Sequence, residues 1–239
     1  MILRTAPYIV LALMLVPIGG GLVATLIPSF GYFPALGGLA FSLDPWRELF
    51  AWPGLGQSVW LTVFTGFAST LIAFLLVQVL LGLSFGTSWL TRFSALISPI
   101  ISVPHAAMAV GLVFLIAPSG FGMRLISPEL TGFNRPPDWL IVGDEWGLSL
   151  VAGLIIKEFP YLLLMSLAAV NQIPAAASLK MGQALGHTRL SSWFRLILPQ
   201  LYPHLRLALF AVLAFSLSTV EMALILGPTT PRPLAPQIL

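Results

Sequence analysis

The sequence contains no cysteine and few charged residues, and both deficits restrict the kind of protein that it encodes. Without cysteine, the chain forms no disulfide bond and offers no thiolate ligand to a metal ion. Charged residues make up 8% of the 239 residues and apolar residues 58%, and the mean hydropathy is +0.97. These values lie outside the range of soluble globular domains. The net charge of +3 is also too small to indicate a nucleic acid as partner.

The sequence also lacks the residue patterns of common catalytic and nucleotide-binding sites. A phosphate-binding loop needs Gly-Lys-Ser/Thr, but the only two lysines, Lys157 and Lys180, follow Ile156 and Leu179. The three histidines lack the spacing of a zinc protease, and no G-x-S-x-G sequence is present. We therefore expect neither ATP hydrolysis nor another enzyme activity in this chain, and no cofactor.

Several stretches without a charged residue are long enough to cross a bilayer. The first extends from Thr5 to Leu43 and the second from Leu49 to Thr91, and a span needs about 20 apolar residues. Because the hydrocarbon core offers backbone groups no water, and these runs lack the alternation of barrel strands, we expect helices. The expected fold class is all-α, a polytopic helical membrane protein whose first span is an uncleaved helix. The predicted spans are Ala6–Ile27, Gln57–Leu83, Ala95–Ala117, Gly147–Val170 and His204–Leu226.

The basic residues divide unevenly between the two sides of the predicted membrane. One side carries six basic residues and no acidic residue: Arg4, Arg92, Lys180, Arg189, Arg195 and Arg206. The other side carries four basic and six acidic residues: Arg47, Arg124, Arg135, Arg232, Asp44, Glu48, Glu129, Asp138, Asp144 and Glu145. Because loops rich in lysine and arginine stay in the cytoplasm, we predict a cytoplasmic N-terminus.

The predicted spans divide the chain at residue 56. Residues 1–56 hold the first helix and an outer loop, and residues 57–239 hold the remaining spans with a cytoplasmic loop at 171–203. Five spans place the C-terminus outside, in a proline-rich stretch after Gly227-Pro228. Because nothing in this stretch ends the pattern, we expect a fragment whose sixth helix is missing.

The loop at 171–203 contains the polar segment Lys180–Pro199 between two apolar spans. We expect Pro174 to open a first helix, Gly186 to end it as a left-handed cap, and Thr188 to cap a second helix. The apolar face of that second helix would consist of Leu190, Trp193, Phe194 and Ile197. Pro199 would stop it. Two interpretations remain open: an amphipathic loop on the membrane surface, or a helix that docks in a groove of a soluble partner.

The same segment resembles the coupling-loop signature of ABC importer permeases. That signature has Glu-Ala-Ala, three residues, a glycine, a spacer, and then an apolar residue, any residue and Leu-Pro. Alignment on Leu198-Pro199 puts the glycine at Gly186 and the apolar position at Leu196. The Glu-Ala-Ala positions fall on Lys180, Met181 and Gly182. A base therefore replaces the acid of the signature. The resemblance implies that a cytoplasmic ATPase binds this coupling loop at Lys180, Met181, Gly182, Leu185, Gly186, Leu190, Leu196 and Pro199.

Further segments extend the resemblance from about Gln57 to the end of the chain. SVPHAAMAVGL at Ser102–Leu112 is similar to the third-helix segment of these permeases. IKEFPYLLL at Ile156–Leu164 and TVEMALILGPTTPRPLA at Thr219–Ala235 resemble the thiamine- and iron-type branch, which includes thiamine-like relatives. In that branch two permease units are often fused, so the chain is similar to the first half of a tandem permease.

This resemblance carries expectations about fold, location and partners. It implies a MetI-like type I permease core, multi-pass in the bacterial inner membrane and in contact with lipid. The implied partners are a cytoplasmic ABC ATPase, a second permease unit that is fused or separate, and an extracytoplasmic solute-binding protein. The implied function is that of an importer subunit that forms part of the solute pathway.

Charged residues inside the predicted spans indicate either a solute pathway or a structural tie. Lys157 and Glu158 lie at the centre of the fourth span, where each charge costs about 2.5–3.5 kcal/mol. Pro160 follows and is expected to break or kink the helix, as in transporters with sites on broken helices. The structural alternative, which we favour, is an ion pair between Lys157 and Glu221. His105 follows a proline, and a helix-to-helix hydrogen bond is more common for such a histidine than a place in the pathway.

Two other functions remain as alternatives. The first is a proton-coupled secondary transporter with Lys157, Glu158, Glu221 and His105 as a proton relay. The coupling loop argues against it, because a secondary transporter has no ATPase to dock. The second is an intramembrane hydrolase with Ser98 or Ser102 next to His105, for which no nucleophile motif is present.

Overall fold

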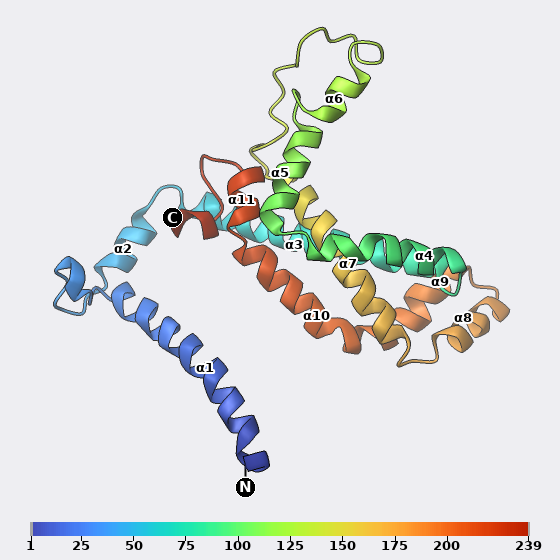
Figure 1. The fold of residues 1–239 in the computed structure, drawn as a ribbon, viewed down its shortest axis with the longest axis horizontal. Helices are drawn as coiled ribbons and strands as arrows, with labels where there is room; N and C mark the ends of the chain where they lie inside the picture. Colours follow the sequence, from blue (N-terminus) through green and yellow to red (C-terminus); the bar gives the residue numbers. More distant parts are fainter. Residues whose placement is uncertain (1, 239) are drawn as a thin grey trace. The chain divides into compact units, whose positions relative to one another are not determined.

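The computed structural model describes residues 2–238, and in that range every regular element is helical (Figure 1). The all-α, polytopic fold class is therefore confirmed. Five helical segments in the described range are long and apolar enough to cross a membrane: Thr5–Ser29, Leu55–Ser84, His105–Ile126, Leu148–Val170 and Arg189–Ser218. The first, second and fourth agree with the predicted spans within two residues at each end, whereas the third and fifth differ. The side chain of Arg4, which counted toward the predicted orientation, lies outside the described part.

Contacts divide the chain into two units, Met1–Leu55 and Gly56–Leu239. The first unit contains α1 (Ile2–Ser29), the short η1 (Pro34–Leu36) and α2 (Asp44–Ala51). Side chains of α1 from residue 5 onward are almost all exposed, as suits a helix surrounded by lipid. The connection after α1 is held by a backbone hydrogen bond of 2.7 Å from Ser42 N–H to the Phe30 carbonyl and by the stacked rings of Tyr32 and Phe41.

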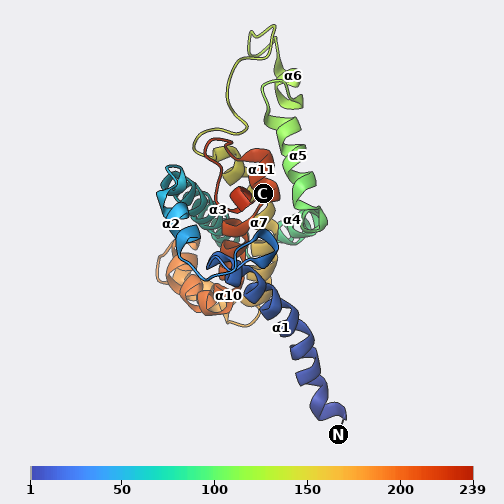
Figure 2. The same cartoon turned by 90° about the vertical axis from the view of Figure 1, so that its left-hand side faces the viewer.

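The second unit holds the remaining elements. They are α3 (Leu55–Ser84), α4 (Ser88–Ile97), η2 (Ser98–Ser102), α5 (His105–Ile116), α6 (Phe121–Ile126), α7 (Leu148–Val170), α8 (Ala175–Ala184), α9 (Arg189–Ser192), η3 (Trp193–Ile197), α10 (Leu198–Ser218), α11 (Glu221–Leu226) and η4 (Ala235–Ile238). α7 packs against η2, α10 and α11, and α11 also packs against α5. Both views show α5 leading into α6, and α6 lies farther from the other helices of this unit (Figures 1 and 2).

Two clusters of buried apolar side chains hold the second unit together. The larger one places Val77 and Leu81 of α3 against Leu163 of α7 and against Trp193 and Ile197 of η3. All five are at most 1% exposed, so this cluster is closed without help from another chain. It fixes the predicted coupling loop, residues 171–203, to α3 and α7.

The smaller cluster joins α7 to α5 and α11. Leu112 of α5, Leu154 of α7 and Leu226 of α11 belong to it. A Cβ at Gly153 would meet the side-chain ends of Leu226 and Met222, so α11 packs closely on α7 at this glycine. Since α7 contributes to both clusters, it is the central helix of the unit.

The third and fifth predicted spans are interrupted in the structure. The predicted span Ala95–Ala117 consists of α4, the 3₁₀ turn η2 and α5, with extended backbone at Val103. Pro104 accounts for this break because a residue before proline is disfavoured in the helical conformation. The predicted span His204–Leu226 is also displaced: its helix starts earlier and ends at Ser218, and extended backbone at Thr219 separates α11.

Pro160 lies inside α7 without breaking it, so of the expected break or kink the break does not occur. The helix continues from Leu148 to Val170 with Pro160 inside it. Proline removes one backbone donor, but in membrane helices packed neighbours and local adjustment tolerate the loss. Pro160 is buried among such neighbours.

Candidate functional site

The coupling loop, residues 171–203, begins with α8, whose end matches the prediction. Gly186 has φ +84°, which is the left-handed conformation. The backbone N–H of Gly186 donates to the Gln183 carbonyl at 3.0 Å, and that of His187 donates to the Gly182 carbonyl at 3.1 Å. These two bonds form a Schellman cap, which satisfies the last carbonyls of a helix and turns the chain sharply. The expected left-handed cap at Gly186 is confirmed.

The second part of the loop begins as predicted and ends differently. The Thr188 hydroxyl accepts a hydrogen bond of 3.2 Å from Ser191 N–H and so caps α9. A π-helical turn follows, in which Leu198 N–H donates to the Trp193 carbonyl. Pro199 then lies in the first turn of α10 and does not stop a helix, so that prediction was wrong. The π-helical turn just before Pro199 already shifts the backbone hydrogen bonds by one residue, at the place where proline supplies no N–H.

The residues of the predicted coupling signature divide into an outward and an inward set. The outward set is exposed and consists of Lys180, Met181, Leu185, Gly186 and Pro199. Met181 and Leu185 are four residues apart, so their exposed apolar side chains share one face of the α8 turn. The inward set is Gly182, which is buried, with Leu190 and Leu196, which are partly buried.

Gly182 is the point where the two parts of the coupling loop meet. A Cβ on this residue would lie 2.7 Å from the Ser192 Cβ and 2.9 Å from the Leu196 Cδ1. The absence of a side chain therefore lets α8 pack on α9 and η3. Of the three residues aligned with Glu-Ala-Ala, Gly182 is the one whose small size is explained by its packing.

Two side chains that the signature does not include attach the loop to α3. Arg189 donates from Nε to the Gly82 carbonyl at 3.1 Å and from Nη2 to the Phe85 carbonyl. Trp193 is fully buried, and its Nε1 donates to Oε1 of Gln78 at 3.2 Å. Gln78 was not among the site residues predicted from the sequence. An amide inside an otherwise apolar span was the available signal, because buried polar groups in membranes need partners.

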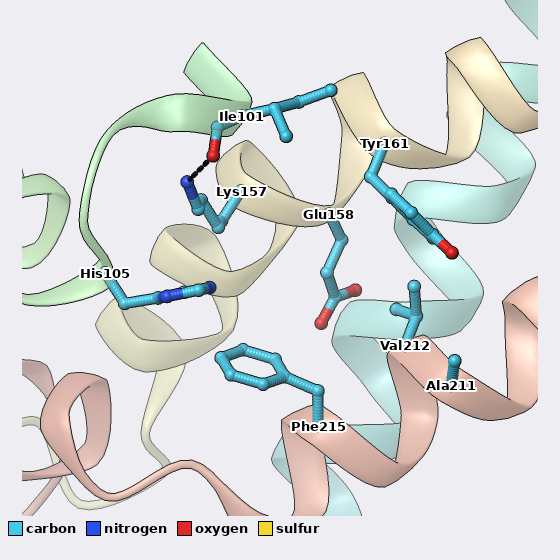
Figure 3. Close-up of a pocket in the computed structure, with 8 residues that line it drawn as sticks. All are labelled: Ile101, His105, Lys157, Glu158, Tyr161, Ala211, Val212 and Phe215. Atoms are coloured by element: carbon cyan, nitrogen blue, oxygen red, sulfur yellow. Dashed lines mark hydrogen bonds between the residues drawn. The ribbon is translucent and has the colours of Figure 1, made fainter. Parts of the chain in front are cut away.

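A cavity of about 230 Å³ lies between η2, α5, α7 and α10 (Figure 3). Its lining residues are Ile101, His105, Lys157, Glu158, Tyr161, Ala211, Val212 and Phe215. Three of the four predicted intramembrane residues, His105, Lys157 and Glu158, therefore meet at one place. Glu221 does not line this cavity; it is exposed in the first turn of α11.

Lys157 forms hydrogen bonds to backbone carbonyls and not to Glu221. Its Nζ lies 2.9 Å from the carbonyl oxygens of Ile100 and Ile101 and also donates to the carbonyl of Val103. In the described range, the one ion pair joins Arg47 and Asp44. The predicted Lys157–Glu221 pair is thus not formed, because the break before α5 leaves three carbonyls that match the three donors of the ammonium group.

Glu158 has an uneven set of partners. Its Oε1 accepts hydrogen bonds from the hydroxyl of Ser69 on α3, at 3.2 Å, and from the hydroxyl of Ser216 on α10. Its Oε2 is buried and has no hydrogen-bond partner among the described residues. One carboxylate therefore joins three helices at the cavity wall.

The remaining predicted residue at the cavity, His105, packs on an aromatic ring. Its ring centroid lies 4.4 Å from that of Phe215. The hydroxyls of Ser98 and Ser102 donate to the carbonyls of Ala95 and Pro99 on their own segment. Neither serine is thus held by His105, and the geometry gives no support to a hydrolase.

Comparisons with known proteins agree with the resemblance of the loop. No protein-family model matches the chain. The chain is 32% identical over 197 residues to the inner membrane ABC transporter permease protein YnjC of Escherichia coli (strain K12). The alignment covers 82% of this chain and 36% of the length of that relative. A transporter permease is not an enzyme, which supports the expectation that this chain is not one.

This similarity and the five apolar helices support a multi-pass protein of the inner membrane. The chain is related to the permease proteins of ABC transporters.

Proposed function

We propose that this chain is a permease subunit of an ATP-driven importer and forms part of its solute pathway. A cytoplasmic ABC ATPase binds the coupling loop, and a second permease unit, fused or separate, completes the pathway. An extracytoplasmic solute-binding protein delivers the solute to the side that carries the acidic loops. The N-terminus and the coupling loop face the cytoplasm, in keeping with the distribution of basic residues.

The construction of the coupling loop carries this proposal. Gly186 turns the chain after α8, and Gly182 packs α8 on the following turn, while Met181 and Leu185 remain exposed. A loop anchored by buried contacts that presents two apolar side chains suits docking in the groove of a partner. An amphipathic loop on the membrane surface needs no such anchoring.

The cavity beside Lys157 and Glu158 is the proposed part of the solute pathway in this chain. It lies against the break between η2 and α5, and irregular backbone at membrane depth is tolerated where it is buried or lines a cavity. The resemblance to the thiamine- and iron-type branch makes those solutes the first to test. A proton relay is less well supported, because Glu221 does not line this cavity and Lys157 is bonded to carbonyls.

Co-purification with the cognate ABC ATPase tests the proposal. Gly186→Asp should abolish binding, because it adds a charge and a side chain at the exposed turn of the coupling loop. Gly37→Asp is the matched control: Gly37 also has positive φ, +87°, and an added Cβ has nothing within 4 Å, but it lies in the other unit. If membrane-inserted Gly186→Asp protein binds and stimulates the ATPase as well as wild type does, the proposed role of the loop is wrong.

A further inference from the structure

Gln78 is a fully buried amide in the C-terminal third of α3. It is bonded to Trp193, which belongs to the larger apolar cluster together with Val77, the residue before Gln78. A buried amide without partners costs roughly 1–3 kcal/mol, so its hydrogen bonds determine how the surrounding helices fit. Gln78 therefore fixes the relative position of the helices around it, which an apolar residue of similar size would not do.

The partners of this amide lie on two other elements of the fold. Oε1 of Gln78 accepts from Nε1 of Trp193 at 3.2 Å, and Nε2 donates to the Ser166 hydroxyl on α7 at 3.4 Å. The orientation of the amide is forced, because an indole nitrogen only donates and must face the amide oxygen. The NH₂ group is then directed to α7. One side chain thus joins α3 to the coupling loop and to α7.

The coupling loop also holds the cytoplasmic end of α3. Arg189 donates to the carbonyls of Gly82 and Phe85, which belong to the last turn of α3 and its immediate continuation. A Cβ on Gly82 would lie 3.1 Å from the Trp193 Cβ, so α3 and η3 are in close contact. These contacts join residues more than 100 positions apart in the sequence.

The other end of this connection is the cavity. Ser69 lies on α3, about 13 Å along the helix from Gln78 at 1.5 Å per residue. Its hydroxyl bonds to Oε1 of Glu158 at 3.2 Å. A continuous path of hydrogen bonds and packed side chains therefore leads from the coupling loop through α3 to the cavity wall.

We propose that α3 transmits the displacement of the coupling loop to the cavity and that Gln78 is the positioning residue that makes the helix follow the loop. This inference rests on the proposed function, because it requires an ATPase to move the loop. α7 and α10 are covalently continuous with the loop, whereas α3 is joined to it by non-covalent contacts, among them those of Gln78, Arg189 and Trp193. Without the hydrogen bonds of the Gln78 side chain, the loop still docks the ATPase. A displacement of the loop then no longer produces the same displacement of α3.

The test measures whether the cavity senses the nucleotide state. The chain has no cysteine, so Ala211→Cys places a single thiol of this chain at the cavity. Its reaction rate with a water-soluble maleimide is measured in the ATPase complex, once without nucleotide and once trapped with ATP and vanadate. Gln78→Leu should reduce the ratio of the two rates at least about fivefold, the lower end of typical coupling between sites, while the ATPase still co-purifies. Thr65→Val is the matched control, because the buried Thr65 hydroxyl bonds only to carbonyls of its own helix.

A double-mutant comparison identifies the connection itself. Trp193→Phe keeps most of the ring packing but removes the N–H donor, so it should reduce the ratio in the same way. The double variant should be no worse than the more affected single variant, because both lose the same bond. Two results would overturn the proposal. In the first, the ratio of rates in the double variant falls by the product of the two single reductions; in the second, the Gln78→Leu protein keeps the wild-type ratio. If Gln78→Leu does not assemble, Trp193→Phe alone decides the question. If the wild-type chain binds no ATPase, the proposed function fails and this inference with it.

Discussion

The ammonium group of Lys157 lies 2.9 Å from the carbonyl oxygen of Ile101, at the break in the third membrane segment (Figure 3). A cation in the middle of a span is thus stabilised by backbone dipoles and needs no acidic partner. Carbonyls at the end of a helical turn lack intrahelical donors, and a lysine supplies three. Lys157 therefore holds the interrupted segment against α7.

This arrangement predicts that Lys157→Met destabilises the protein. Three carbonyls near the break would lose a charged donor, and we expect a loss of roughly 1–3 kcal/mol in the free energy of unfolding. Thermal unfolding in detergent measures it. Lys180→Met is the control, because the only other lysine is exposed on α8. An equal change in both variants would contradict the role of the carbonyls.

The same arrangement predicts the outcome of a charge exchange. If Lys157 depends on carbonyls, Lys157→Glu combined with Glu221→Lys stays as unstable as Lys157→Glu alone, because residue 221 does not reach the carbonyls. The double variant and both single variants are compared by yield of inserted protein and by thermal unfolding. Recovery in the double variant would show that the two residues pair after all.

The bonds of Glu158 predict coupling between α7 and α10. Ser216→Ala removes a donor to a buried carboxylate and should cost roughly 1–3 kcal/mol in the free energy of unfolding. In a Glu158→Leu background the same change should cost much less, because its partner is gone. Ser84→Ala is the control, since the Ser84 hydroxyl bonds only to a carbonyl of its own helix. Equal costs of Ser216→Ala in both backgrounds would show that the Glu158 bond contributes nothing.

The two glycines of the coupling loop should respond differently to substitution. Gly186 has room around it but a positive φ, so Gly186→Asn should be tolerated and Gly186→Ala should cost about 1 kcal/mol. Gly182 has an ordinary helical backbone but no room, so Gly182→Leu should separate α8 from α9. Limited proteolysis of the loop measures the separation. Gly111→Leu, at a helix position with nothing within 4 Å of an added Cβ, is the control.

The predicted orientation leads to a labelling result. Lys180→Cys should react with an impermeant maleimide only after the inner face of the membrane is opened, because basic loops remain in the cytoplasm. Asp138→Cys, in the long loop between α6 and α7, should react in intact spheroplasts. Reaction of Lys180→Cys from outside would remove the basis for ATPase docking.

Much of the fold follows from composition and from a few turn residues. Long apolar runs without charge identify helices, because a bilayer leaves no alternative for the backbone. Gly186 and Thr188 marked the cap and the start of neighbouring helices, and both are where local chemistry requires them. These features depend only on residues close in sequence.

Prolines were less informative than expected because their effect depends on what surrounds them. Pro104 breaks a segment, Pro160 is accommodated inside a helix, and Pro199 lies in a first turn. A missing N–H matters only at a position where that N–H would donate a backbone hydrogen bond within the helix. The sequence does not show where each helix begins, so the three cases look alike.

The partners of buried polar groups could not be predicted from sequence. Lys157 was expected to need an acid, but the acceptors are backbone carbonyls, which every residue has. Gln78 was overlooked because its partners, Ser166 and Trp193, come from distant segments. Such pairs depend on which helices pack together, and that is set by the whole fold.

The π-helical turn at Trp193–Ile197 gives the chain one residue more than a continuous α-helix would hold. That extra residue rotates the segment before it by about 100° relative to α10. Removing any one residue from the turn would make Arg189–Ser218 a regular α-helix, and Arg189 would then point away from the end of α3. A one-residue gap or insertion at this place in related sequences therefore marks a change in how the loop is attached.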